Sequence, residues 1–267
     1  MTRIAVFGAT GRMGQTLVRL ITDSDDLELA GATTEPGHAA VGSDAGTAAG
    51  LVQPLGISIT DDAPTALTGA DVAIDFTMPA AVPDNVAVCV EHGVALVIGT
   101  TGLSAAHDAL LADAAASIPL LYGRNMSVGI NLLSALAREA SRALGADFDI
   151  EIVEAHHRDK VDAPSGTALQ LGEFAAQGRN VDLDSVAVYD RHDVKSARVP
   201  GSIGFSSIRA GHIVGDHTVL FGADEEMIEL RHRALDRAVF ARGALRAATW
   251  LVQRPPGFYS MNDVLGL

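Results

Sequence analysis

The first 33 residues contain the pattern that most constrains the fold of this chain. The segment "RIAVFGATGRMGQTLVRLI" joins an apolar run to a glycine-rich turn and then to a segment with helical spacing. The run at 4–7 is short and apolar throughout, which is typical of a strand buried on both faces. Residues 15–21 have helical spacing, and 27–33 predict the next strand. A strand, a turn, a helix and a second strand indicate a parallel βαβ unit.

The same alternation continues to about residue 126. Apolar segments at 70–77, 94–101 and 118–123 predict three more strands. Segments at 81–92 and 104–116 predict the helices between them. Strands that alternate with helices favour the α/β class, here a Rossmann-like, doubly wound parallel sheet.

The pattern changes after Met126. An amphipathic helix is predicted at 129–145, followed by a half-buried strand at 148–157 that alternates apolar and acidic residues. Strand-like runs with glycine turns then follow one another at 202–211, 212–222 and 226–234, before a last helix at 237–253. Consecutive strands without helices between them predict an antiparallel or mixed sheet. We therefore expect a first domain at 1–126 and a second, α+β domain with an open mixed sheet at 127–235.

Charge limits the classes of partner. The net charge is −14, and no Lys or Arg occurs from Leu20 to Gly123, where fourteen Asp or Glu occur. This balance disfavours a nucleic-acid partner. An anion bound by the first half must be held mainly by backbone amides and helix dipoles. No stretch reaches the ~18 apolar residues of a membrane span, and no signal peptide precedes "RIAVFG", so we expect no membrane partner and a cytoplasmic location.

The glycines of "GATGRMG" predict a dinucleotide site. Gly8, Gly11 and Gly14 let the backbone turn tightly and approach a pyrophosphate, which the following helix N-terminus stabilises. The spacing is G-x-x-G-x-x-G, and a tight turn without a cofactor is the alternative. Glu35 ends the second strand region, where an acid binds ribose hydroxyls or is simply a solvated loop residue. No arginine follows Glu35, so we expect NADH to be used at least as well as NADPH.

The segment "EAHHRDKVDAPSGTA" at 154–168 predicts proton chemistry. It contains Lys160, one of only two lysines in the chain, and a lysine amine can be tuned to release its proton whereas arginine cannot. His156 lies four residues before Lys160, so both can line one cleft. The Ser165–Thr167 segment after Pro164 predicts a helix start whose amides and hydroxyls can bind a carboxylate. A proton donor beside a carboxylate site and a nicotinamide-type loop indicate a reductase of a small acid.

Other residues leave alternatives open. The two adjacent histidines with Asp159 and Asp162 lack a second cluster at ligand spacing, so we expect no metal. Cys89 lies in an apolar run and is expected to be a buried, inert thiol. Asp75 is as consistent with turn capping as with catalysis. Arg209 is a surface or substrate residue, which we leave outside the predicted site, and His217 and His232 are expected to be structural.

Two rival functions remain from the residues alone. One is another two-domain nicotinamide oxidoreductase, which would ordinarily need a Cys nucleophile or a Tyr/Lys pair near a motif. The other is a non-catalytic dinucleotide sensor, which would need no pair of His156 and Lys160.

Several motifs together resemble the dihydrodipicolinate reductase (4-hydroxy-tetrahydrodipicolinate reductase) family of lysine and diaminopimelate biosynthesis. They are "GATGRMG", "IDFT", "GTTG", "RNMSVGINLL", "EAHHRDKVDAPSGTA" and "IGFSSIRAGHIVGDHTV", which occur in the family's order over essentially the whole chain. The resemblance implies NADH- or NADPH-dependent reduction of 4-hydroxy-tetrahydrodipicolinate, via dihydrodipicolinate, to tetrahydrodipicolinate. It also implies a dinucleotide-binding domain at 1–126 completed by 236–267, and a substrate-binding and oligomerisation domain at 127–235 whose open sheet assembles a homotetramer.

The resemblance also implies a role for each matching residue. His156 would be the acid/base residue and Lys160 the proton donor. The small dicarboxylate substrate would be held by His157, Ser165, Gly166 and Thr167. The cofactor would be bound by Gly8, Ala9, Thr10, Gly11, Arg12, Met13, Glu35, Gly99, Thr100, Thr101, Gly123, Arg124, Asn125 and Met126. The family usually has small residues where this chain has Gly123 and Arg124, so Arg124 either contacts a cofactor phosphate or faces solvent; His212 also departs from the usual pattern.

Overall fold

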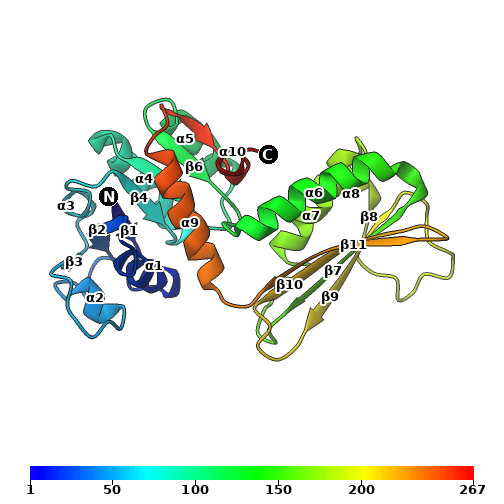
Figure 1. Ribbon diagram of the computed structural model, residues 1–267, viewed down its shortest axis with the longest axis horizontal. Helices are drawn as coiled ribbons and strands as arrows, with labels where there is room; N and C mark the ends of the chain where they lie inside the picture. Colours follow the sequence, from blue (N-terminus) through cyan, green and yellow to red (C-terminus); the bar gives the residue numbers. More distant parts are fainter. The chain divides into compact units, whose positions relative to one another are not determined.

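A computed structural model describes residues 1–267, and the chain divides into two compact units. The first unit is made of Met1–Ser127 and Ala238–Gly266, so the chain leaves it and returns to it. The second unit is Val128–Arg237. Each unit is built around one sheet (Figure 1).

The sheet of the first unit has seven strands, and every neighbouring pair is parallel. The order is β12-β6-β5-β4-β1-β2-β3. The strands are β1 (Thr2–Phe7), β2 (Leu27–Thr33), β3 (Ile59–Thr60), β4 (Val72–Asp75), β5 (Ala95–Ile98), β6 (Pro119–Tyr122) and β12 (Gly257–Tyr259). The order reverses at β1, which is the arrangement of a doubly wound dinucleotide-binding sheet. The predicted fold class is confirmed for this unit.

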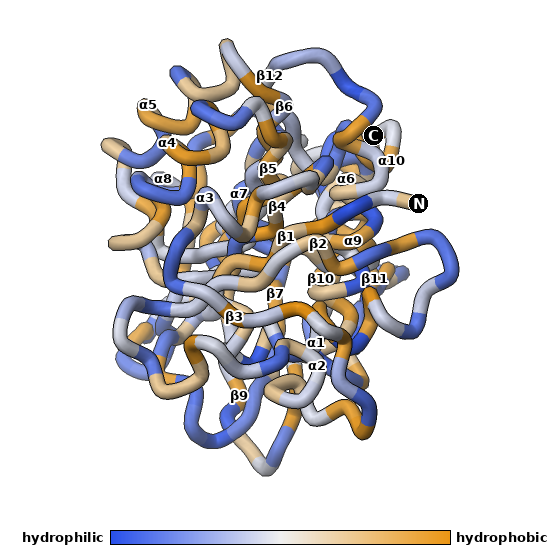
Figure 2. The backbone as a smooth tube through the Cα atoms, turned by 90° about the vertical axis from the view of Figure 1, so that its left-hand side faces the viewer, coloured by the Kyte–Doolittle hydropathy of each residue, from blue (hydrophilic) through white to orange (hydrophobic).

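Helices cover both faces of this sheet because its central strands are apolar on both sides. Helices α1 (Arg12–Thr22) and α9 (Ala238–Leu251) pack together on one face. Helices α4 (Val82–His92) and α5 (Ala105–Ala114) pack on the other. Shorter helices are α2 (Ala45–Ala48), α3 (Ala63–Ala66), η1 (Pro79–Ala81) and α10 (Met261–Leu265). Figure 2 shows β1 as a largely hydrophobic segment between these layers.

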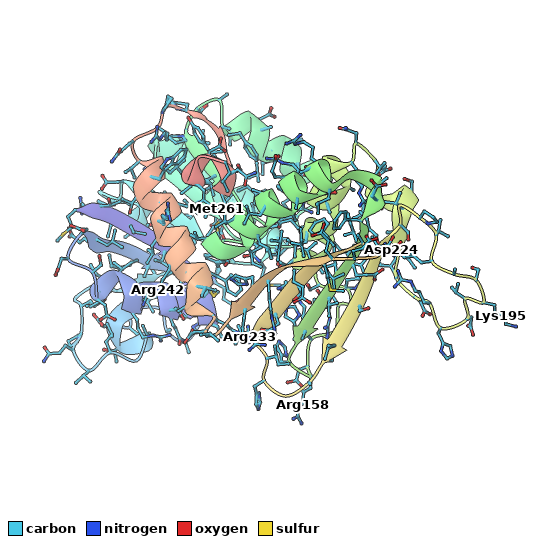
Figure 3. The ribbon with its side chains drawn as sticks, turned by 45° about the vertical axis from the view of Figure 1, so that its right-hand side comes forward. Arg158, Lys195, Asp224, Arg233, Arg242 and Met261 are labelled. Carbon is cyan, nitrogen blue, oxygen red and sulfur yellow. The ribbon has the colours of Figure 1, made fainter.

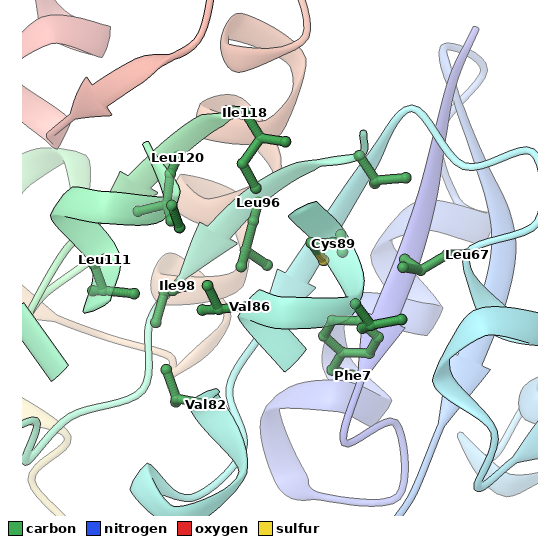
Figure 4. Packing of buried hydrophobic residues seen from close by; sticks show 14 of the residues in the cluster. Phe7, Leu67, Val82, Val86, Cys89, Leu96, Ile98, Leu111, Ile118 and Leu120 are labelled. Atoms are coloured by element: carbon green, nitrogen blue, oxygen red, sulfur yellow. The ribbon is translucent and has the colours of Figure 1, made fainter. Parts of the chain in front are cut away.

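The core under α4 and α5 is built from side chains of both layers. Phe7, Leu96 and Leu120 come from the strands, and Val86 and Leu111 come from the helices (Figure 4). Cys89 is fully buried in this cluster, and burial raises the pKa of its thiol far above the ordinary range. The thiol is therefore inert, as its apolar neighbours in the sequence indicate.

The second unit has a five-stranded mixed sheet of order β11-β10-β7-β9-β8. Strands β7 (Asp149–His156), β9 (Ile203–Arg209) and β8 (Ala187–Val188) are parallel, whereas β10 (Gly215–Gly222) and β11 (Met227–Ala234) run antiparallel to their neighbours. Helices α6 (Val128–Leu144) and α7 (Gly166–Gly178) pack on one face of the sheet. The unit also contains η2 (Gly145–Asp147) and α8 (Leu183–Val186).

Side chains along β7 alternate between the two faces of this sheet. Ile150 and Ile152 lie in the core under the helices, whereas Glu151 and Val153 are on the open face and partly exposed. Glu154 and His156 continue the buried series, so two polar side chains are carried into the helix side of the sheet. Lys195 lies at the other end of the sheet, on the exposed loop before β9 (Figure 3). Of the two lysines, only Lys160 therefore lies in the loop that follows β7.

The structure adds elements that the sequence pattern does not predict. They include the short strands β3, β8 and β12, and β12 extends the first sheet beyond β6. The strand predicted at 70–77 is shorter, Val72–Asp75, because the chain turns at Asp75 and Thr77. No helix combines the length and the apolar composition that a membrane crossing requires.

We predict that Gly243→Ala destabilises the first unit, although alanine ordinarily favours a helix by about 1 kcal/mol over glycine. A Cβ at Gly243 would lie 1.7 Å from the backbone oxygen of Met126, so α9 would have to shift. Overpacking of this kind costs about 1–3 kcal/mol. Thermal and urea unfolding measure the change. Gly166→Ala, in α7 with open space around its Cβ position, is the control, and equal effects of the two substitutions would contradict the prediction.

Candidate active site

The glycine loop connects β1 to α1 in a tight turn. Gly8 has φ +72°, a left-handed conformation that glycine adopts without strain. A Cβ at Gly14 would lie 2.2 Å from the Gly8 carbonyl oxygen, so the loop and the first turn of α1 pack at a distance that only glycine allows. The Ala9 amide donates to Thr33 O at 2.7 Å, which ties the loop to the end of β2.

The start of α1 fits a bound pyrophosphate. Its N-cap residue is Gly11, no side chain caps the first turn, and the first turn contains no acidic residue. The amides and the positive end of the helix dipole are therefore available to an anion. Glu35 is exposed, two residues beyond the end of β2. The residues present thus fit a dinucleotide with its pyrophosphate at α1 and its ribose near Glu35.

The loops after β4, β5 and β6 lie at the same edge of the sheet, because all these strands are parallel. The loops after β5 and β6 contain the predicted residues Gly99, Thr100, Thr101, Gly123, Arg124, Asn125 and Met126. Thr101 and Arg124 are exposed, whereas Thr100 and Met126 are buried. A Cβ at Gly99 would lie 2.2 Å from the Phe76 ring, so this loop also packs closely.

Asp75 holds the turn after β4. Its fully buried carboxylate accepts hydrogen bonds from the Thr77 amide at 2.7 Å and from the Asn85 amide group at 2.8 Å. The hydroxyls of Thr77 and Thr100 donate to it at 2.6 Å and 3.0 Å. Oδ1 accepts three of these bonds and Oδ2 accepts one, and the carboxylate is fully buried. The geometry favours turn capping over catalysis, and the Thr100 hydroxyl serves the same turn.

The second unit gathers polar groups at the carboxyl end of β7. His156 Nδ1 lies 2.5 Å from Glu154 Oε2, and the two residues are 8% and 1% exposed. Arg209 donates to both Glu154 oxygens, from Nη1 at 2.8 Å and from Nη2 at 2.7 Å. The Ser165 amide donates to Oε1 at 3.2 Å. Glu154 and His156 are two residues apart on one strand, which is the spacing that places them on one face.

Lys160 lies in the loop between β7 and α7. Its Nζ is 2.9 Å from Asp162 Oδ1, and its side chain is about a quarter exposed, so it is open to a ligand. His157 Nε2 lies 3.2 Å from Arg237 Nη2, which brings a second cation to the loop. His156, His157 and Lys160 are thus all in one part of the second unit. No three His, Cys, Asp or Glu side chains are grouped so that they could hold a metal ion.

Ser165 begins α7 and uses its hydroxyl inside the protein. The Ala168 amide donates to Oγ at 3.2 Å, and His217 Nε2 lies 3.1 Å from the same atom. Ser165 is 2% exposed, whereas Gly166 is exposed with open space beside it. Of the predicted carboxylate-binding segment, the backbone at Gly166 is therefore the part most open to a ligand.

Burial and charge set the protonation of this cluster. Burial alone would raise the pKa of Glu154, but hydrogen bonds from Arg209, Ser207 and His156 outweigh it and lower the pKa to about 2. Burial lowers the pKa of His156, and with the charges of Lys160 and Arg209 it outweighs the neighbouring Glu154, which raises the pKa. Burial also lowers the pKa of His217 to about 3. At neutral pH the cluster contains an ionised Glu154 and two neutral imidazoles.

Three members of the cluster, Glu154, Arg209 and His217, are missing from the predicted site. Arg209, which the sequence analysis leaves outside, donates to the buried Glu154, and Glu154 itself is not predicted. His217 is 4% exposed, and its ring lies edge-on to His156 with centroids 5.1 Å apart. The usable signal is the position of Glu154 two residues before His156. No local pattern marks Arg209, 55 residues further along the chain.

We predict that His217 makes folding stability fall as the pH is lowered from 6.5 to 4.5. In this range an unfolded histidine takes up a proton, whereas the buried one, with a pKa of about 3, does not. The unfolded state then binds more protons, which costs the folded state about 1.4 kcal/mol per pH unit. Glu154, whose pKa is also lowered, adds to this loss only below its ordinary value of 4.5.

The measurement is the unfolding temperature against pH. The pKa values of His156 and His232 are also lowered, so these residues still reduce stability at low pH when His217 is replaced. His217→Gln should therefore flatten the curve of unfolding temperature against pH without abolishing its slope. His192→Gln, in an exposed loop, is the control and should follow the original curve. Parallel curves for His217→Gln and the original chain would contradict the prediction.

Comparison with protein-family models gives two consecutive matches. The model described as "Dihydrodipicolinate reductase, N-terminus" matches residues 2–126. The model described as "Dihydrodipicolinate reductase, C-terminus" matches residues 129–265. The two matches together account for nearly the whole chain.

Curated relatives carry a corresponding name. The 4-hydroxy-tetrahydrodipicolinate reductase of Ruegeria pomeroyi is 53% identical over 264 residues, which cover 99% of this chain and 98% of the relative. The enzyme of the same name from Parvibaculum lavamentivorans is 50% identical over 265 residues, with 99% and 98% covered.

Solved structures share the fold. A structure described as dipicolinate-bound dihydrodipicolinate reductase from Paenisporosarcina sp. TG-14 superposes with a TM-score of 0.78 at 23% identity and covers 98% of both chains. An amine dehydrogenase from Mycobacterium smegmatis gives 0.59 at 16% identity, with 98% of this chain and 95% of that one covered. The full-length matches to both family models and to curated relatives at about half identity show that this chain belongs to the dihydrodipicolinate reductase family.

Proposed function

We propose that this chain reduces 4-hydroxy-tetrahydrodipicolinate, via dihydrodipicolinate, to tetrahydrodipicolinate with NADH or NADPH, in lysine and diaminopimelate biosynthesis. The observation that carries the proposal is the grouping of His156, His157 and Lys160 beside the start of α7. The curated relatives, named for this reaction and similar over their full length, support it. The two units would then be the cofactor-binding and the substrate-binding parts of the enzyme.

In this proposal the first unit binds the dinucleotide. The backbone amides of Gly8–Met13 hold the pyrophosphate, and Glu35 accepts hydrogen bonds from the adenosine ribose. The loops at Gly99–Thr101 and Gly123–Met126 run along the rest of the cofactor. The close packing of the glycine loop and the uncapped first turn of α1 support these roles. When bound, the reduced nicotinamide supplies the hydride that adds to C4 of the conjugated cyclic imine.

The second unit binds a small dicarboxylate. A related solved structure is described as dipicolinate-bound, which supports this class of ligand. We assign the two carboxylates to His157, Ser165, Gly166 and Thr167, with Lys160 near one of them. The exposed backbone of Gly166 at the first turn of α7 suits a carboxylate, because helix N-terminal amides stabilise anions. Ser165 contributes through its backbone, since its hydroxyl already bonds within the protein.

Lys160 and His156 handle the proton. Addition of a hydride at C4 leaves an enamine whose carbon must be protonated. The ammonium of Lys160, held by Asp162 at 2.9 Å, carries protons and donates one. His156 is neutral at neutral pH, because burial lowers its pKa, so it can accept a proton at one ring nitrogen and return it. Homotetramer assembly through the open face of the second sheet and a cytoplasmic location stay predictions.

We predict that His156→Gln and Lys160→Ala each lower kcat by about 10²–10⁴-fold, the usual contribution of a general acid or base. The assay follows consumption of reduced nicotinamide with freshly generated 4-hydroxy-tetrahydrodipicolinate. NADH binding, measured by fluorescence titration, should stay within about twofold, since both residues belong to the second unit. Turnover in the original chain with unchanged kcat in both variants would remove these residues from the mechanism. Binding of NADH without any turnover would point to a dinucleotide sensor.

We further predict that NADH is used at least as well as NADPH. The 2′-phosphate of NADPH needs a cation near the adenosine ribose, and no Lys or Arg occurs between Leu20 and Gly123. Arg12 is the only cation in the glycine loop. Initial rates against both cofactors at one substrate concentration measure the two KM values. A KM for NADPH far below that for NADH would contradict the prediction.

A further inference from the structure

Glu154 and Arg209 form a buried ion pair next to His156. Their side chains are 1% and 19% exposed. They come from neighbouring parallel strands, since Arg209 on β9 is in register with His156 on β7. The pair belongs to the second unit, and neither residue has a role in the function proposed above. Apolar residues of similar volume often stabilise a core as well as a buried ion pair does. Stability alone therefore does not explain why Glu154 and Arg209 are buried here.

The hydrogen bonds to Glu154 determine which nitrogen of His156 carries a hydrogen. Oε1 accepts from Arg209 Nη2 and from the Ser165 amide, at 2.7 Å and 3.2 Å. Oε2 accepts from Arg209 Nη1 at 2.8 Å and lies 2.5 Å from His156 Nδ1. An ionised carboxylate only accepts hydrogen bonds. His156 Nδ1 must therefore be the protonated nitrogen, which leaves the lone pair of a neutral ring on Nε2.

Gly215 and His217 are neighbours of the His156 ring, and Gly215 leaves space beside Nε2. A Cβ at Gly215 would lie 3.2 Å from Nε2 and 3.5 Å from Cδ2 of the same ring. Gly215 on β10 therefore leaves space that any side chain would fill. The ring of His217 meets His156 edge-on, with centroids 5.1 Å apart, and limits how the imidazole can tilt.

Arg209 also holds the loop that carries Lys160. Its Nε donates to the Lys160 carbonyl oxygen at 3.2 Å, and its Nη2 donates to the Asp162 carbonyl oxygen at 2.6 Å. Asp162 in turn pairs with Lys160 Nζ at 2.9 Å. One guanidinium thus contacts both the partner of His156 and the backbone of the Lys160 loop at two points. A lysine could not make this set of bonds, because it lacks the planar fork of five donors.

We propose that Glu154 and Arg209 act as a positioning pair for both proton-handling side chains. Glu154 fixes His156 in the Nδ1–H form with Nε2 as its reactive nitrogen, and Arg209 holds Glu154 and the Lys160 loop in one arrangement. The proposal rests on the function proposed above for its effect on catalysis. Its statement about the His156 ring concerns the free protein and can be tested without turnover.

The first test is 15N NMR of the histidine rings in the complete chain without ligands, at neutral pH. The His156 signals are identified by their absence in His156→Gln. We expect a protonated Nδ1 and an unprotonated Nε2. A His156 ring protonated only at Nε2 would overturn the proposal, whether or not the enzyme turns over its expected substrate.

The second test is Glu154→Gln. At the place of Oε1 the amide NH2 would face two obligatory donors, Arg209 Nη2 and the Ser165 amide. At the place of Oε2 it would face only one, Arg209 Nη1, so it should take that place. His156 can then accept from it only by moving its own hydrogen to Nε2. We expect this change in the NMR spectrum, a fall of about 10²–10⁴-fold in kcat, and little change in KM for NADH. Unchanged kcat and an unchanged ring would contradict the proposal.

The matched control is Glu151→Gln on the same strand. Glu151 is also an ion-paired glutamate, held by Arg191 and Arg198, but it lies on the opposite face of β7. We expect kcat and the His156 signals to stay unchanged. A fall in kcat equal to that of Glu154→Gln would mean that loss of any ion-paired glutamate on β7 is sufficient to lower kcat. That result would contradict the positioning role of Glu154.

Arg209→Lys tests whether the two residues act as one unit. It keeps the charge and removes the bidentate and carbonyl contacts, so we expect kcat to fall as well. The double variant Glu154→Gln, Arg209→Lys should lose less kcat than the product of the two single losses, because both substitutions break the same pair. If the loss of kcat in the double variant equals the product of the two single losses, Glu154 and Arg209 act independently and the proposal is contradicted. If a variant does not fold by circular dichroism, the ring measurement in the original chain still decides the proposal.

Discussion

Parallel pairing of β1 with β2 and β4 is the constraint on which the first unit depends. Because all seven strands run in one direction, every loop that follows a strand emerges at the same edge of the sheet. The order of the strands reverses at β1, so the glycine loop lies where neighbouring connections diverge. The loop must also turn within a few residues into α1. Gly14 satisfies this demand, because its missing Cβ would lie 2.2 Å from the Gly8 oxygen.

The second unit depends on a different interaction, the buried carboxylate of Glu154. Its strand alternates regularly, so Glu154 enters the helix side of the sheet in the same series as Ile150 and Ile152. Removal of one partner from such a pair typically costs about 3–5 kcal/mol, because a charge is left buried alone. The hydrogen bonds from Arg209 and Ser165 compensate the charge. The same bonds join β9 and the start of α7 to β7, so the site and the core of the unit share one network.

The sequence predicts the elements that have a hydrophobic period and fails on those that have none. The strand at Leu27–Thr33 is predicted with its observed bounds, because seven residues show a clear pattern. β3 and β8 have two residues each and β12 has three, too few for any period to appear. In the candidate site, His156 and Lys160 are predicted by local spacing. Arg209 is not, because its contact with Glu154 spans 55 residues and depends on the parallel pairing of β7 with β9.

Side-chain direction explains a further difference between the predicted and the observed site. The Ser165–Thr167 segment predicts a carboxylate grip by hydroxyls and amides together, and a sequence cannot show which way a hydroxyl points. In the structure Ser165 caps α7 and turns its Oγ toward Ala168 and His217. The cap leaves the exposed backbone at Gly166 for a ligand. A similar limit applies to Asp75, whose carboxylate accepts hydrogen bonds from its own turn at Thr77 and from Asn85 and Thr100.

The two units differ in where their cations lie and in how each can bind an anion. The first has no cation between Leu20 and Gly123, so an anion there must rely on backbone amides whose positions the sheet and α1 determine. The second places Lys160, Arg209 and Arg237 around two histidines. Burial, together with the charges of Lys160 and Arg209, lowers the pKa of His156 although Glu154 lies beside it. A neutral His156 held at one nitrogen by an ionised glutamate is the state in which the other nitrogen can take up a proton.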